Sequence, residues 1–84
     1  LVSFQALFND KFLQENSKFT SMNDLIIRSG FGIMNLLEVE NVNQEKWNAY
    51  IAKNSNCTTW FEFGKLAMIE WMKAKLEEVK NAAN

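Results

Sequence analysis

The sequence contains no proline and only three glycines, at positions 30, 32 and 64. A small domain built from strands needs more turn residues than this, because its chain reversals depend on residues that tolerate unusual backbone angles. No stretch of the chain alternates polar and apolar residues at the period of two that marks a half-buried strand. The sequence therefore predicts an all-α fold.

The length and the aromatic content predict one domain with a small core. Eighty-four residues suffice for one domain and not for two. Seven Phe, three Trp and one Tyr stand within a hydrophobic fraction of 48%, which is well above the range of disordered chains. We therefore expect residues 1–84 to fold as a single helical domain.

The first half of the chain carries two helical patterns. Four apolar residues at helical spacing predict a first helix over about residues 2–16. They are Phe4, Leu7, Phe8 and Phe12. Ser21, with Asp24 three residues later, resembles a capping box and predicts the start of a second, short helix. Gly30 can take the left-handed conformation that ends a helix, so we expect the second helix to stop there.

The second half continues in the same way. Residues 31–42 are too apolar for an exposed loop, and we expect another helical turn or two within them. Asn43 is a suitable N-cap for a third helix that ends near Asn54. Thr59 begins a second capping-box pattern, and the helix that it starts is predicted to reach about Lys80.

The two inter-helix corners resemble each other when the chain is aligned with itself at an offset of 38 residues. Asn16-Ser17 then meets Asn54-Ser55, and the apolar residue Phe19 meets Cys57. Each copy has a helix end, an Asn-Ser stop, one apolar plug, a capping box and a new helix. Two corners can also converge on these features independently, so the alignment leaves both origins open.

These patterns together define an expected architecture. We predict a small orthogonal bundle of four to five helices, made of two helix–corner–helix units packed face to face, with a long C-terminal helix. An internal duplication would relate residues of about 9–31 to residues of about 47–69.

The residue types needed for most catalytic chemistry are missing. The chain has no His and a single Cys, which excludes a Cys–His nucleophile pair and the usual zinc ligand sets within the chain. No glycine-rich loop follows a strand to hold a phosphate group. We therefore expect a protein that is not an enzyme and has no cofactor and no metal, with Cys57 as a small buried hydrophobe.

The charge balance disfavours nucleic acids and membranes as partners. Nine basic and ten acidic groups give a net charge of −1, whereas phosphate backbones and anionic membranes attract clustered Lys and Arg. The apolar runs are too short to span a bilayer, and no signal-peptide pattern is present. We expect a cytoplasmic protein.

One segment nevertheless has the appearance of a helix-turn-helix, the motif that many DNA-binding regulators use. Residues 25–37 read as a helix, a glycine turn and a second helix. The unit has one basic residue, Arg28, and its second helix would lead into the acidic residues Glu38 and Glu40. A nucleic-acid-binding regulator is therefore an alternative function, although an ordinary corner explains the pattern better.

The last predicted helix has an apolar stripe on one side. Ile69, Met72, Leu76 and Val79 follow one another at 3-4-3 spacing, and the helix should outrun the others past about residue 73. Phe63 and Leu66 break the charged sector on the helical wheel. These six residues are the candidate partner-binding surface; the alternative is that the remaining helices cover them as core.

We therefore expect a protein-interaction module or regulatory accessory protein that docks through its C-terminal helix, onto a second copy or onto another protein. The aromatic and Met residues between positions 60 and 72 leave one further alternative, a helical bundle that binds an apolar ligand.

Overall fold

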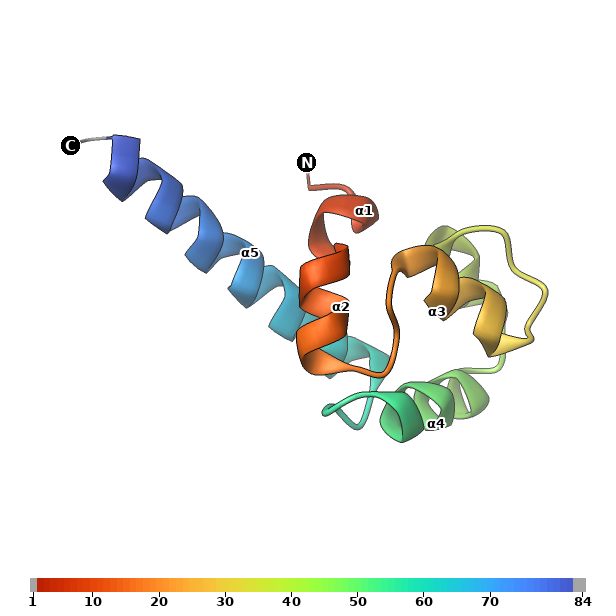
Figure 1. Ribbon diagram of the computed structural model, residues 1–84. Coiled ribbons are helices and arrows are strands. Elements are labelled where there is room, and N and C mark those ends of the chain that lie inside the picture. The colour runs from red at the N-terminus through yellow and green to blue at the C-terminus, as the bar shows by residue number, and fades with distance from the viewer. Residues whose placement is uncertain (1, 83–84) are drawn as a thin grey trace.

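The computed structural model describes residues 2–82, and it consists of helices and short connections (Figure 1). None of the described residues belongs to a β-strand. The elements in chain order are α1 (Phe4–Leu7), α2 (Asp10–Asn16), α3 (Met22–Ser29), the 3-10 helix η1 (Leu36–Asn41), α4 (Gln44–Asn54) and α5 (Trp60–Ala82). The predicted all-α bundle with a long C-terminal helix is confirmed.

The predicted first helix over residues 2–16 is wrong in one respect, because it is broken into α1 and α2. The Asn9 side chain serves both pieces: its Oδ1 accepts from Phe12 N at 2.9 Å, and its Nδ2 donates to Ala6 O at 2.9 Å. The amide thus caps the N-terminus of α2 and satisfies a carbonyl of α1. The break places the Phe8 side chain in the core, where it is 2% exposed.

The second helix has the predicted limits. Ser21 Oγ accepts from Asp24 N at 3.0 Å, which caps α3. Gly30 follows the last residue of α3 with a φ of 71°, the left-handed conformation that terminates helices. The helical turn expected within residues 31–42 is η1, and Asn35 and Glu38 form a capping box at its start.

The third and last helices begin where their caps predict. Asn43 Oδ1 accepts from Lys46 N at 2.9 Å and starts α4. Glu62 N donates to Thr59 Oγ1 at 3.1 Å in the first turn of α5. α5 is the longest element of the fold, with 23 residues that end at Ala82.

The two corners share their hydrogen bonds as well as their residue types. Ser17 Oγ donates to the carbonyl four residues earlier at 2.6 Å and accepts from the amide two residues later at 3.1 Å. Ser55 Oγ makes the equivalent bonds at 2.7 and 3.1 Å. An isolated antiparallel bridge joins Ser17 to Ser55, so the two corners lie side by side.

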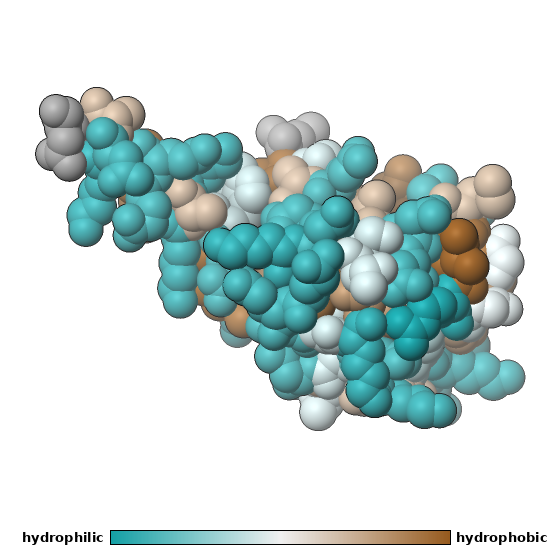
Figure 2. Space-filling model, viewed as in Figure 1, coloured by the Kyte–Doolittle hydropathy of each residue, from teal (hydrophilic) through white to brown (hydrophobic). Residues whose placement is uncertain are grey.

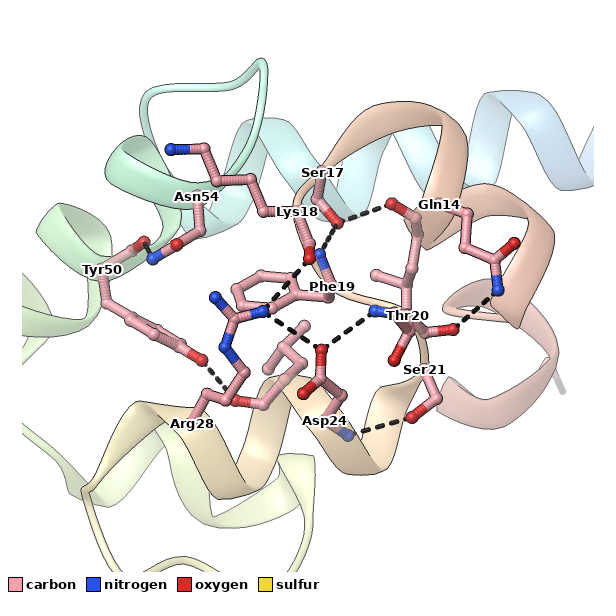
Figure 3. Close-up of polar contacts among 12 residues, drawn as sticks. Gln14, Ser17, Lys18, Phe19, Thr20, Ser21, Asp24, Arg28, Tyr50 and Asn54 are labelled. Carbon is pink, nitrogen blue, oxygen red and sulfur yellow. Dashed lines mark hydrogen bonds and ion pairs between the residues drawn. The ribbon is translucent and has the colours of Figure 1, made fainter.

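The capping acids also correspond. Asp24 Oδ2 accepts from Thr20 N at 3.0 Å, and Glu62 Oε2 accepts from Thr58 N at 3.2 Å. In both corners the acid therefore reaches back four residues, one further than the predicted capping box. The hydrogen bond from Thr20 N lowers the pKa of Asp24, and the neighbouring Arg28 guanidinium also lowers it. Figure 3 shows this corner and its polar contacts.

Reciprocal backbone bonds link the corners across an approximate two-fold axis. Lys18 N donates to Asn54 O at 2.8 Å, and Asn56 N donates to Asn16 O at 3.1 Å. The offset of 38 residues relates the two bonds, because Lys18 corresponds to Asn56 and Asn54 corresponds to Asn16. The duplication remains a prediction, but the two corners are built on matching bonds.

A cluster of aromatic rings fills the core between the two helix–corner–helix units. Trp47 and Phe63 are 0% exposed and lie at its centre. The Trp60 ring bridges them, with centroids 5.5 Å from Trp47 and 6.3 Å from Phe63. Tyr50 borders the cluster, and its hydroxyl donates to Leu25 O at 2.6 Å, which ties α4 to α3 (Figure 3).

Candidate functional site on the C-terminal helix

The first half of α5 belongs to the bundle and the second half projects from it (Figure 1). The first half packs against α1 and α4, and it buries Phe63 and Ala67. Every residue from 72 to 82 is exposed. The helix outruns the rest of the fold, as its sequence predicts.

One of the six candidate interface residues lies in the interior, and a second is partly covered by the bundle. Phe63 is 0% exposed, with its ring centroid 5.5 Å from Phe8 and 5.2 Å from Phe12. Leu66 is half-buried and packs against the same core. We correct the prediction for Phe63, which cannot face a partner, because α1 and α2 fold over this side of α5.

The other four candidates lie together on the outside. Ile69 is 41% exposed, Met72 53%, Leu76 65% and Val79 66%. Their 3-4-3 spacing places them on one side of the helix. We call these four residues the α5 seam.

Two exposed residues beside the seam were not among the candidates. Phe61 is 78% exposed and Met68 is 38% exposed. They are one heptad apart, and both lie before the seam, in line with one of its edges, so their spacing was a signal in the sequence. The first half of α5 is apolar around most of its circumference, and sequence alone did not show which side the bundle covers.

Charged side chains make up most of the remaining surface of the projecting half. Lys75 Nζ lies 3.1 Å from Glu78 Oε2, in an ion pair whose members are both more than half exposed. The same ammonium lies 5.6 Å from the centroid of the Trp71 ring. From the side shown in Figure 2 the projecting arm is largely hydrophilic, so the apolar surface does not extend around the whole helix.

The segment that resembles a helix-turn-helix does not continue into a second α-helix. Its second element is η1, a 3-10 helix of six residues that carries Glu38 and Glu40. Arg28 Nη1 donates to Lys18 O at 3.1 Å, and the guanidinium stands over the Phe19 ring at 5.5 Å (Figure 3). The single basic residue of the motif, Arg28, thus stabilises the corner between α2 and α3.

Cys57 occupies the plug position as a half-buried thiol. Burial raises the pKa of Cys57, and the Glu62 carboxylate raises it further. Both effects disfavour the thiolate, which is the nucleophilic form. The sequence predicts a buried hydrophobe here; the structure places Cys57 against the core but only partly buried.

Several half-open grooves lie on the surface of the part of the chain that the structure describes. One groove, of about 740 Å³, is lined by residues of α1, α2, α3 and the segment before η1, with polar Asn, Asp and Lys side chains among them. A smaller one of about 230 Å³ lies between α2 and α5, beside Trp71. Of the aromatic residues proposed to line an apolar-ligand pocket, Phe63 is in the core and Trp60 packs against it, stacked on Phe8 with centroids 5.0 Å apart, whereas Phe61 is exposed.

The described residues contain no group of three or more His, Cys, Asp or Glu side chains that could hold a metal ion. Within residues 2–82, no helix combines the length and the apolar character needed to cross a membrane. Comparison of the chain with protein-family models, with curated proteins and with solved structures gave no match. The α5 seam is therefore judged on its own geometry.

Proposed function

We propose that this chain is a non-enzymatic protein-interaction module that docks a partner helix on the α5 seam. The observation that carries the proposal is the exposure of four large apolar side chains on a projecting helix, from 41% at Ile69 to 66% at Val79. A continuous apolar strip of this kind on a small protein is typical of a docking surface.

The width of the strip favours a helix as the docked element. Seam residues at 3-4-3 spacing form the narrow stripe of a coiled-coil contact, whereas a helix that packs on a broad core presents a wider apolar face. Phe61 and Met68 extend one edge of the stripe toward the bundle. A partner helix laid along this surface would cover apolar side chains over about three helical turns.

A synthetic helix with uncharged flanks tests the docking surface. The probe is a three-heptad peptide with Leu at its seam positions and Gln at the positions beside them, labelled for fluorescence anisotropy. We expect it to bind the full chain, and to lose at least about tenfold in affinity when Met72→Glu or Leu76→Glu places a charge in the seam.

The matched control for these variants is Ile27→Glu on α3. Ile27 is 68% exposed and lies outside the α5 seam, so the substitution adds the same charge at a similarly exposed apolar residue. Binding should survive it. Peptide binding that is equal in all three variants, or absent from the unmodified chain, would contradict the proposed docking surface.

A further inference from the structure

The charges beside the α5 seam constrain which helix can dock there. In a heptad frame with Ile69 at position a, the seam occupies positions a and d of the projecting half. The bundle-facing Ala67 takes position f, directly opposite, and is 1% exposed. The frame therefore agrees with the packing, and its e and g positions are the two edges of the seam.

Lysine dominates these edges. Lys73 and Lys80 take position e, and Lys75 takes position g. The other edge positions from 66 to 82 hold Leu66, Met68 and Ala82, so no acid takes an edge position. One turn before Ile69, the d position itself is Lys65. All four lysines are exposed.

The acids of this half lie further from the seam. Glu70 and Glu77 take position b, and Glu78 takes position c. The Lys75–Glu78 ion pair at 3.1 Å joins an edge position to an outer one. Exposed pairs of this type contribute little, so Lys75 can exchange this partner for one across an interface.

A second copy of the chain is a poor occupant of the seam. In a parallel pair, position g of one helix faces position e of the other, so Lys75 would face Lys80. In an antiparallel pair with seam layers matched, e faces e and g faces g, so Lys73 would face Lys73 and Lys75 would face Lys75. Both orientations place like charges together at the edges, which disfavours association.

We propose that the α5 seam binds an amphipathic helix of a different protein, whose apolar stripe is flanked by Asp and Glu. This inference rests on the proposed docking function and names the chemistry of the partner. Acids at the partner's edge positions would meet Lys73, Lys75 and Lys80 in a parallel or an antiparallel arrangement. The same three lysines thus favour a partner helix with acidic edges and disfavour association with a second copy of the chain.

Lysines beside an apolar stripe also occur on helices that lie on anionic membranes. Here the acids at Glu70, Glu77 and Glu78 balance the lysines at 73, 75 and 80, and the seam is a narrow stripe rather than half of the helix surface. These features favour a helical partner, and a membrane becomes an outcome that the experiment distinguishes.

Two charged versions of the probe peptide test the inference. Both have Leu at the seam positions, one with Glu at every edge position and the other with Lys. We expect the Glu peptide to bind the full chain at least about tenfold more tightly than the Lys peptide, and to weaken as salt rises from about 0.01 M to 1 M. Light scattering of the chain without peptide should give the mass of a monomer.

Charge reversal provides the matched control. The triple variant Lys73→Glu, Lys75→Glu, Lys80→Glu should prefer the Lys peptide instead. A second triple variant, Lys18→Glu, Lys46→Glu, Lys53→Glu, changes the net charge equally at exposed lysines on the bundle, outside α5. It should retain the preference for the Glu peptide, which separates edge contacts from the overall charge of the molecule.

Three results would overturn the inference. The first is equal binding of both charged peptides. If Leu76→Glu still abolishes binding of the Gln peptide in that case, the proposed docking surface stands and only the selection of the partner by charge fails. The second is a dimer mass in solution. The third is tighter binding to phosphatidylglycerol-containing vesicles than to the Glu peptide, in a manner that depends on the seam.

Discussion

The two halves of α5 carry similar apolar residues in opposite surroundings. Phe63, in the first half, is 0% exposed, whereas Leu76, in the second half, is 65% exposed. The two differ because the bundle packs against the first half, whereas every residue from 72 to 82 in the second half is exposed. An apolar side chain on this helix therefore contributes to the core only where the bundle covers it.

The largest effect is expected in the covered half. Phe63→Ala removes a ring that contacts Phe8 and Phe12, and it leaves a cavity in a small core. The free energy of unfolding should fall by about 3–5 kcal/mol, which approaches the total stability of many small domains. Urea denaturation followed by Trp fluorescence measures it; a loss below about 1 kcal/mol would mean that the first half of α5 is not core.

A smaller loss is expected where α4 joins α3. Tyr50→Phe removes the hydroxyl that donates to Leu25 O at 2.6 Å and should cost about 0.5–1.5 kcal/mol of unfolding free energy. The same denaturation experiment measures the change. An unchanged stability would show that the tie between α3 and α4 does not depend on this bond.

The pKa of Tyr50 tests independently whether its side chain is buried between α3 and α4. Burial raises the pKa of Tyr50 to about 12 from its ordinary value of 10, because it disfavours the phenolate. The folded pKa is the higher one, so the contribution to stability is complete below pH 10 and is lost as pH rises from about 10 to 12. Tyr50 is the single tyrosine, so ultraviolet absorbance follows its phenolate directly; a midpoint near 10 in the folded chain would contradict the burial.

The paired corners predict equal effects at equivalent positions. Ser17→Ala and Ser55→Ala each remove a hydroxyl that makes matching bonds to the backbone. Each should lower the unfolding free energy by about 1 kcal/mol, and the two losses should agree within about 0.5 kcal/mol. A large effect in one corner and none in the other would contradict their equivalence.

Helix limits could be predicted from the sequence wherever a side chain caps a helix alone. Ser21 and Asn43 begin α3 and α4 as predicted, and Gly30 ends α3. Asn9 was missed because the apolar spacing of the first segment continues through it, as in an unbroken helix. Its capping role depends on Phe8 turning into a core that only the folded chain creates.

The candidate site was predicted in part for a similar reason. The 3-4-3 stripe gave the four seam residues, since spacing alone places them on one side. The helical wheel favoured Phe63 over Phe61 as an exposed residue because Phe63 borders the charged sector, but this turn is apolar nearly all round and the wheel does not show which side the bundle covers. Packing of α1 and α2 decides that Phe63 is covered and Phe61 is exposed.

The most direct test of the central claim is the unfolding free energy of Leu76→Glu, measured by urea denaturation beside its binding to the Gln-flanked peptide. The account predicts a stability change within about 0.5 kcal/mol, because Leu76 is an exposed residue on the projecting half, together with a loss of peptide binding. A loss of about 2 kcal/mol or more would instead show that the second half of α5 is core, and the docking surface would then be disproved.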